Sequence, residues 1–71
     1  KGGMLAVGAS ASDIQQILDA MRGNKAVIAC VNSESSVTLS GDLDVIANLQ
    51  TALDKEGIFT RKLKVDVAYH S

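Results

Sequence analysis

Two short amphipathic segments, each enclosed by apolar runs typical of β-strands, constrain the fold of this chain most. In the first segment, apolar residues recur with the three- and four-residue spacing of one helix face; they are Ile14, Ile17, Leu18 and Met21. The second segment repeats this kind of stripe with Val45, Ile46, Leu49 and Leu53. The pattern predicts two helices, each with one face packed against the rest of the domain.

The ends of both segments carry residues that favour helix termini. Ser10 and Asp13 have the spacing of a capping box, and Asp42 is a favourable N-cap for the second helix. Gly23 and Gly57 suit the left-handed residue that follows a helix. The helices are therefore expected between Ser10 and Gly23 and between Asp42 and Gly57.

Four apolar or alternating runs around these helices are typical of strands. They are residues 4–7, 25–31, 37–40 and 59–67, and the glycines at 2–3 and 8 are expected to interrupt the chain on either side of the first of them. The polar stretch NSESS at 32–36 favours a turn, which predicts a hairpin with a loop of about five residues between the second and third runs. The order β-α-β-β-α-β predicts an α+β fold of the ferredoxin-like type, an antiparallel four-stranded sheet with two helices on one face.

The chain is expected to be a single domain over residues 1–71, because it contains no proline and no low-complexity linker. Residues 26–31 are apolar throughout, so both faces of that strand are expected to be covered, with Cys30 as a small buried residue. A single cysteine can form neither an internal disulfide nor a zinc site by itself. A free cysteine is typical of a reducing compartment, and a cytoplasmic location is expected.

Charge and composition argue against two classes of partner. Seven basic and eight acidic residues give a net charge of −1, which does not favour nucleic acid or an anionic membrane. An RNA-binding sheet of this topology needs stacking aromatics, and the chain has only Phe59 and Tyr69. No apolar run approaches the roughly 20 residues of a membrane span. Neither nucleic acid nor membrane is expected as a partner.

Most catalytic motifs are absent from the sequence. The stretch GASAS at 8–12 lacks the final glycine of a nucleophile elbow, so Ser10 is better explained as a helix cap. The single histidine, His70, is the second-to-last residue, and from the residues alone it is most simply a terminal side chain. An independent ferredoxin-like module that binds a small ligand or acts as a regulatory domain, through residues 2–3 and 32–36, fits the same pattern.

Three stretches taken together resemble the acyltransferase domain of polyketide synthases, most closely the iterative fungal type. They are GGMLAVG, VNSESSVTLSGD and LKVDVAYHS. The resemblance also extends to malonyl-CoA:acyl-carrier-protein transacylases and covers essentially the whole chain. It implies that residues 1–71 are the small ferredoxin-like subdomain of that enzyme, an excised insert of a large α/β-hydrolase-like core that holds the nucleophilic serine.

The resemblance also implies roles for particular residues. His70 ends the four-residue motif VAYH, where the family has the general base of a Ser–His dyad. Tyr69, an aromatic beside the histidine, is similar to the malonyl-type pattern, and its ring would occupy the space that an α-methyl group needs; ordinary packing at the junction of the subdomain with the core is an equally good explanation of this residue. Val67 departs from the histidine that malonyl-type enzymes often carry there. Asn32 corresponds to an asparagine near the active-site cleft of related transacylases, although a turn residue is the simpler interpretation of it.

The implied reaction moves a malonyl-type extender unit from coenzyme A to the phosphopantetheine thiol of an acyl carrier protein. The implied partners are the large core, the carrier protein and the coenzyme A thioester, and no cofactor is expected to bind this piece itself. The serine, and the arginine that pairs with the malonyl carboxylate in this family, both belong to the core. The 71 residues alone are therefore expected to be inactive.

Overall fold

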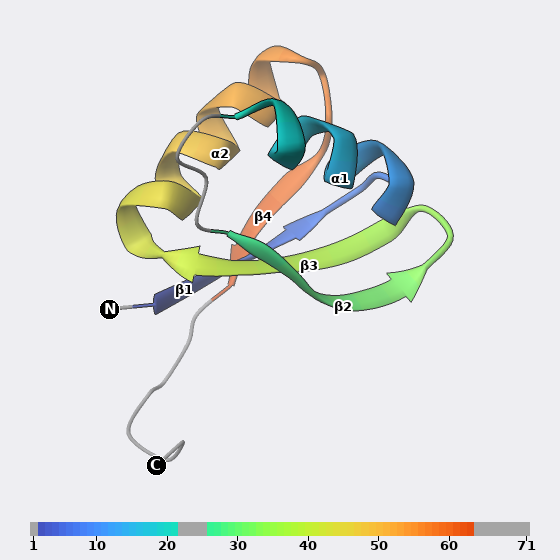
Figure 1. The fold of residues 1–71 in the computed structure, drawn as a ribbon, viewed down its shortest axis with the longest axis horizontal. Helices are drawn as coiled ribbons and strands as arrows, with labels where there is room; N and C mark the ends of the chain where they lie inside the picture. Colours follow the sequence, from blue (N-terminus) through green and yellow to red (C-terminus); the bar gives the residue numbers. More distant parts are fainter. Residues whose placement is uncertain (1, 22–25, 64–71) are drawn as a thin grey trace, which may run out of the picture.

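The computed structural model describes residues 2–21 and 26–63, and these form an α+β fold with the predicted order of elements (Figure 1). The elements are β1 (Gly2–Val7), α1 (Ala11–Ala20), β2 (Val27–Ser33), β3 (Ser36–Asp42), α2 (Leu43–Lys55) and β4 (Thr60–Leu63). The predicted helix stop at Gly23 and the second half of the last predicted strand, residues 64–67, lie outside the described residues.

The four strands form one antiparallel sheet in the order β2-β3-β1-β4, and both helices lie on the same face of it (Figure 1). In the centre of the sheet, β1 and β3 pair along their whole length, from Gly2 with Asp42 to Val7 with Val37. This arrangement confirms the predicted ferredoxin-like architecture.

The hydrophobic core lies between the sheet and the two helices. Strand residues that point toward the helices and helix residues of the two predicted stripes are buried together; they are Leu5, Val7, Ile14, Leu18, Ala26, Val37, Leu39, Ile46, Leu49 and Leu53. The remaining members of the stripes, Ile17, Met21 and Val45, pack against this core from its margin. Within the described residues, no helix lies on the opposite face of the sheet, which we call the helix-free face (Figure 1).

Local interactions at the helix ends agree with the capping pattern. The backbone N–H of Asp13 donates to Ser10 Oγ at 3.1 Å. Asp42 occupies the N-cap position of α2 as predicted, but its side chain makes no capping hydrogen bond; it is also the last residue of β3, so strand and helix meet without a loop. Gly57 follows α2 with φ +76°, a left-handed conformation that a side chain disfavours. No helix in the described part of the chain is both long and apolar enough to cross a membrane.

The first strand begins two residues earlier than predicted. Gly2 and Gly3 were expected to interrupt the strand, but both pair with β3. A Cβ atom on Gly3 would lie 2.8 Å from Leu43 Cδ2 and 3.6 Å from Ile46 Cγ1. A side chain at this position would require the end of the Leu43 side chain to shift, so Gly3 eases the close passage of α2 over the strand and does not break the chain.

The hairpin between β2 and β3 is shorter than predicted. The turn contains only Glu34 and Ser35, because β2 continues through Asn32 and Ser33. The register between the two strands shifts twice, which leaves Ala29 and Asn32 as extra residues of β-bulges on β2. A polar composition favours a turn but does not fix how many residues the turn takes.

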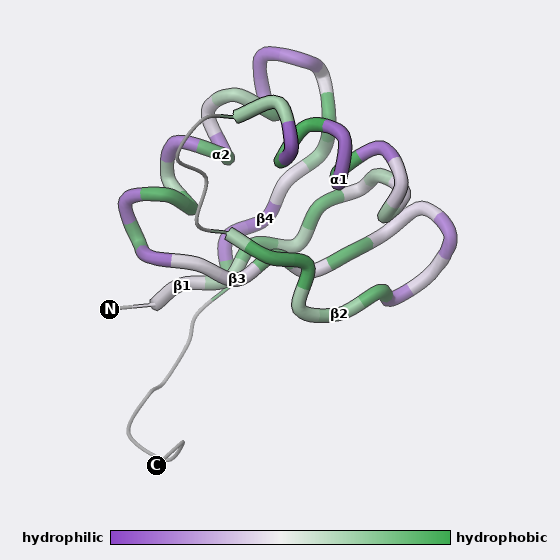
Figure 2. Tube along the Cα trace, in the orientation of Figure 1, coloured by the Kyte–Doolittle hydropathy of each residue, from purple (hydrophilic) through white to green (hydrophobic). Residues whose placement is uncertain are grey.

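The prediction that both faces of β2 are covered is wrong for this structure, and so is the buried environment predicted for Cys30. Figure 2 shows β2 as a mainly hydrophobic run, yet Val27 is 61% exposed, Val31 is 58% exposed and Cys30 is exposed. The physical reason is position: among the described strands β2 is at the edge of the sheet, and neither helix covers the face on which Val27 and Cys30 lie. An apolar run indicates burial only when neighbouring elements lie on both sides of it.

Candidate functional site on the helix-free face

The strand register places side chains of all four strands in rows across the helix-free face. Val37 and Leu39 point into the core, so Thr38 between them points to the opposite face. Thr38 pairs with Cys30 on β2 and with Ala6 on β1. Ala6 in turn pairs with Arg61 on β4. We call these four side chains the Thr38 row.

A second row lies beside the first, toward the Gly2 end of β1. Ser40 pairs with Val27 and with Met4, and Met4 pairs with Leu63. The helix-free face is therefore made of small, apolar and neutral polar side chains, with Arg61 as the charged member of these two rows.

Asn32 is tied to the Thr38 row by two hydrogen bonds. Its Nδ2 donates to Thr38 Oγ1 at 3.0 Å, and its Oδ1 accepts from Cys30 Sγ at 3.3 Å. Asn32 and Cys30 are exposed, whereas Thr38 is only 8% exposed and is the one buried polar residue of the described ranges. The Thr38 hydroxyl is therefore held within the sheet, and the Asn32 carboxamide bonded to it lies at the surface.

The bulges on β2 explain how Asn32 reaches the neighbouring strand. Val31 pairs with Val37 and Ser33 pairs with Ser36, so Asn32 has no partner of its own across the ladder. A bulge bends the strand and changes the direction of the side chain on the extra residue. The result is a side chain on β2 that bonds to a residue of β3.

The structure places only one of the four predicted site residues. Val67, Tyr69 and His70 lie outside the described residues. Asn32 was assigned to a loop, and it belongs instead to strand β2, where it is brought together with Cys30 and Thr38. It does not lie beside the described end of β4, because β3 and β1 separate the two edge strands.

Sequence reasoning missed Thr38 and Cys30 as neighbours of Asn32. The alternation of Val37, Thr38 and Leu39 does indicate that Thr38 faces away from the core. Its proximity to Asn32 follows from the bulge, which no sequence pattern in this chain indicates.

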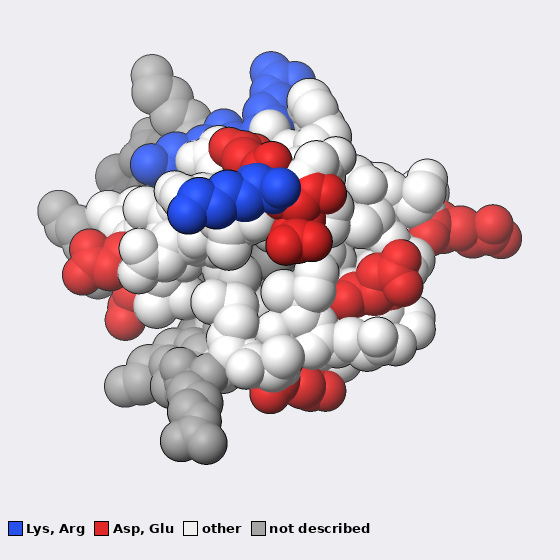
Figure 3. Space-filling model, turned by 90° about the horizontal axis from the view of Figure 1, so that it is seen from above, with Lys and Arg blue, Asp and Glu red and all other residues white. Residues whose placement is uncertain are grey.

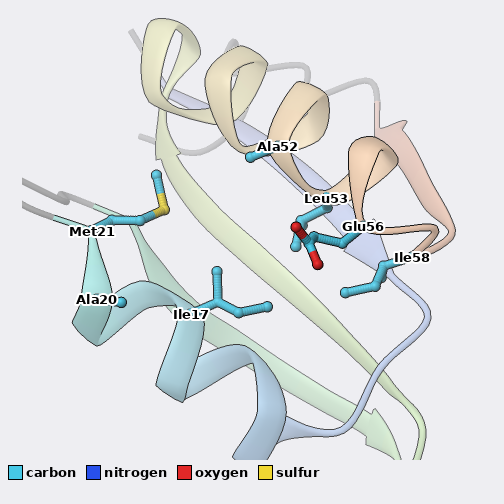
Figure 4. Close-up of a pocket in the computed structure, with 7 residues that line it drawn as sticks. All are labelled: Ile17, Ala20, Met21, Ala52, Leu53, Glu56 and Ile58. Atoms are coloured by element: carbon cyan, nitrogen blue, oxygen red, sulfur yellow. The ribbon is translucent and has the colours of Figure 1, made fainter.

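The helix layer contains a concave feature, but its lining lacks a hydrogen-bonded polar cluster like that of Asn32, Cys30 and Thr38. A groove of about 300 Å³ between α1 and α2 is lined by apolar side chains and by Glu56 (Figure 4). Acidic side chains are spread over this side of the molecule rather than gathered (Figure 3). Within residues 2–21 and 26–63, no three His, Cys, Asp or Glu side chains are grouped so that they could hold a metal ion.

Comparison with known proteins identifies the family to which this chain belongs. The model of the acyl transferase domain family matches residues 1–71, the whole chain. The chain belongs to the acyl transferase domain family.

The similar curated proteins are fungal polyketide synthases. The chain is 48% identical over 71 residues to reducing polyketide synthase rdc5 of Metacordyceps chlamydosporia and 49% identical to squalestatin tetraketide synthase of Phoma sp. (strain C2932). Each match covers 100% of this chain and 3% of the relative, so the chain spans a small part of the length of these proteins.

Solved structures of acyltransferase domains share the fold. The acyltransferase domain from module 8 of the salinomycin polyketide synthase superimposes with a TM-score of 0.85 at 32% identity, over 93% of this chain and 15% of that chain. The acyltransferase domain of an iterative polyketide synthase in enediyne biosynthesis gives 0.79 at 28% identity, over 99% and 18%. The predicted resemblance is confirmed, and the chain is similar to one part of a larger transferase domain.

Proposed function

We propose that this chain is the small subdomain of a polyketide synthase acyltransferase that loads a malonyl-type extender unit onto an acyl carrier protein. The observation that carries the proposal is the match of the family model to all 71 residues. The match to only 15% of a solved acyltransferase domain supports a part that works together with a larger core. The core would supply the nucleophilic serine and the group that binds the malonyl carboxylate.

In this proposal His70 is the general base. Its imidazole would accept the proton of the serine hydroxyl as the serine attacks the malonyl thioester, and would return that proton to the departing thiol of coenzyme A. The malonyl group would then pass from the serine to the phosphopantetheine thiol of the carrier protein by the reverse sequence. Histidine suits both directions because its ordinary pKa lies near neutrality.

Tyr69 and Val67 would contribute to the choice of extender unit. The ring of Tyr69 would fill the space beside the α-carbon and disfavour a methyl group there. Val67 would take the position at which malonyl-type enzymes often have a histidine, so this chain would build that side of the pocket with an apolar side chain.

The helix-free face would form part of the cleft wall, with Asn32 as its hydrogen-bonding group. Apart from Arg61, the two rows on this face carry uncharged side chains, and the helices do not cover the face. The partners in the proposal are the α/β-hydrolase-like core, the coenzyme A thioester and the carrier protein. The free thiol of Cys30 supports a cytoplasmic location.

The proposal is tested with an acyltransferase domain that contains this chain. Transfer of labelled malonyl from malonyl-CoA to a carrier protein is measured for the wild type and for His70→Ala. Removal of one member of a catalytic dyad should lower the rate by about 10³-fold or more. Thermal unfolding of both proteins controls for folding. A His70→Ala variant that folds normally and keeps more than a tenth of the wild-type rate would contradict the proposed mechanism, and the isolated 71 residues should show no transfer.

A further inference from the structure

We propose that Thr38 is a positioning residue that fixes the carboxamide of Asn32 so that it binds an amide of the substrate's pantetheine arm. The inference deepens the proposed function and rests on it. Three observations carry it: the hydrogen bonds of Asn32, the burial of Thr38 and the uncharged nature of the two groups bonded to Asn32.

The burial of Thr38 makes it a suitable anchor. Its residue surface is only 8% exposed, in a central strand that is paired on both sides. A side chain in this position has few alternative conformations, so a partner bonded to it is held in a defined place. Asn32 is exposed on an edge strand and would otherwise rotate freely.

Counting the hydrogen-bonding groups of Asn32 shows what it can offer a ligand. A carboxamide has two N–H donors and one oxygen with two lone pairs. Thr38 takes one donor at 3.0 Å, and the thiol of Cys30 takes one lone pair at 3.3 Å. One donor and one acceptor remain on an exposed group that these two bonds already orient.

A donor and an acceptor held in fixed positions can each bond to a secondary amide, the donor to its carbonyl oxygen or the acceptor to its N–H. The pantetheine arm contains two such amides, and coenzyme A and the carrier protein share this arm. The groups bonded to Asn32 are a hydroxyl and a thiol, both uncharged, so this position suits a neutral ligand rather than a carboxylate. We therefore assign Asn32 to the arm and not to the malonyl group.

The first test compares variants of Thr38 in an acyltransferase domain that contains this chain. Thr38→Val removes the hydroxyl and keeps the branched shape, and Thr38→Ser keeps the hydroxyl. With malonyl-CoA, Thr38→Val should lower kcat/KM about fivefold through KM, as expected for loss of one ordering hydrogen bond. Thr38→Ser should restore most of the loss. Thr51→Val is the matched control, because Thr51 Oγ1 donates to the Ala47 carbonyl at 3.2 Å in the helix layer; it should leave kcat/KM unchanged.

The second test shows whether Thr38 acts through Asn32. Asn32→Ala should lower kcat/KM at least as much as Thr38→Val, and the double variant should be no worse than Asn32→Ala alone. Because Asn32 is exposed, its replacement tests the inference even where Thr38→Val fails to fold. For the malonyl thioester of ethanethiol, which has no amide, both single variants should match the wild type.

Each outcome either supports or overturns the inference. Equal losses with malonyl-CoA and with the ethanethiol ester, additive effects in the double variant, or no effect of Asn32→Ala would overturn it. These results are distinct from failure of the proposed function itself. That failure appears as a wild-type domain that transfers no malonyl group, or as a folded His70→Ala variant that still does.

Discussion

Replacing Leu39 with alanine tests whether the sheet–helix core holds this domain together. Leu39 is 0% exposed at the centre of β3, between its cross-strand partners Leu5 and Ile28. The substitution removes three carbon groups, which at about 0.8 kcal/mol each is about 2.4 kcal/mol of transfer free energy. The cavity left behind raises the expected loss to about 3–4 kcal/mol.

This loss is large relative to the stability of a chain of this size. A domain of 71 residues is expected to have an unfolding free energy of about 4–11 kcal/mol. Urea unfolding followed by circular dichroism measures the change. With a slope near 1 kcal/mol/M, the midpoint should fall by about 3 M urea, and a variant already unfolded without urea would meet the same expectation.

Leu43→Ala is the matched control for this measurement. Leu43 undergoes the same chemical change but is 43% exposed at the start of α2. Scaling the transfer term by its buried fraction gives about 1.4 kcal/mol, with little cavity because solvent fills the space. If Leu39→Ala cost no more than Leu43→Ala, the burial pattern described for the core would be refuted.

Two further predictions concern the helix ends. Ser10→Ala removes the acceptor of the Asp13 N–H and should lower the unfolding free energy by about 1 kcal/mol. Ser12→Ala, in the exposed first turn of α1, is the control and should leave the unfolding free energy equal or slightly higher. Equal losses of unfolding free energy in the two variants would contradict the capping role of Ser10. Gly57→Ala should lower the unfolding free energy by about 1 kcal/mol through backbone strain alone, because no atom lies within 4 Å of the new Cβ. Gly57→Asn should lower it less, because asparagine adopts the left-handed conformation more readily. Urea unfolding measures both variants, and an unchanged midpoint for Gly57→Ala would argue against the left-handed conformation.

The order of helices and strands was predictable because it depends on the spacing of apolar residues, which can be read from a few neighbouring positions in the sequence. The alternation of Val37, Thr38 and Leu39 determines which of them enter the core, and the structure agrees. Cys30 was placed incorrectly because its burial depends on whether another element covers β2, and that is a property of the tertiary arrangement. Gly3 was taken as a strand breaker because the close passage of α2 over it is likewise not local.

The candidate site was less predictable than the fold for the same reason. Asn32 was singled out through a family resemblance, but its partners follow from a one-residue bulge in β2. Sequence patterns report the face on which a side chain lies and not the register of the strand that carries it. His70, Tyr69 and Val67 stay predictions, because they lie outside the described residues.

The two bulges of β2 have a consequence for solubility as well as for Asn32. An edge strand with exposed valines is a template on which the strand of another molecule can add, which is a common route to aggregation. Extra residues at positions 29 and 32 interrupt the even spacing of backbone N–H and C=O groups that such an addition requires. Deleting Ala29 would remove one bulge and straighten β2, and the variant would be expected to aggregate more readily through this apolar edge strand.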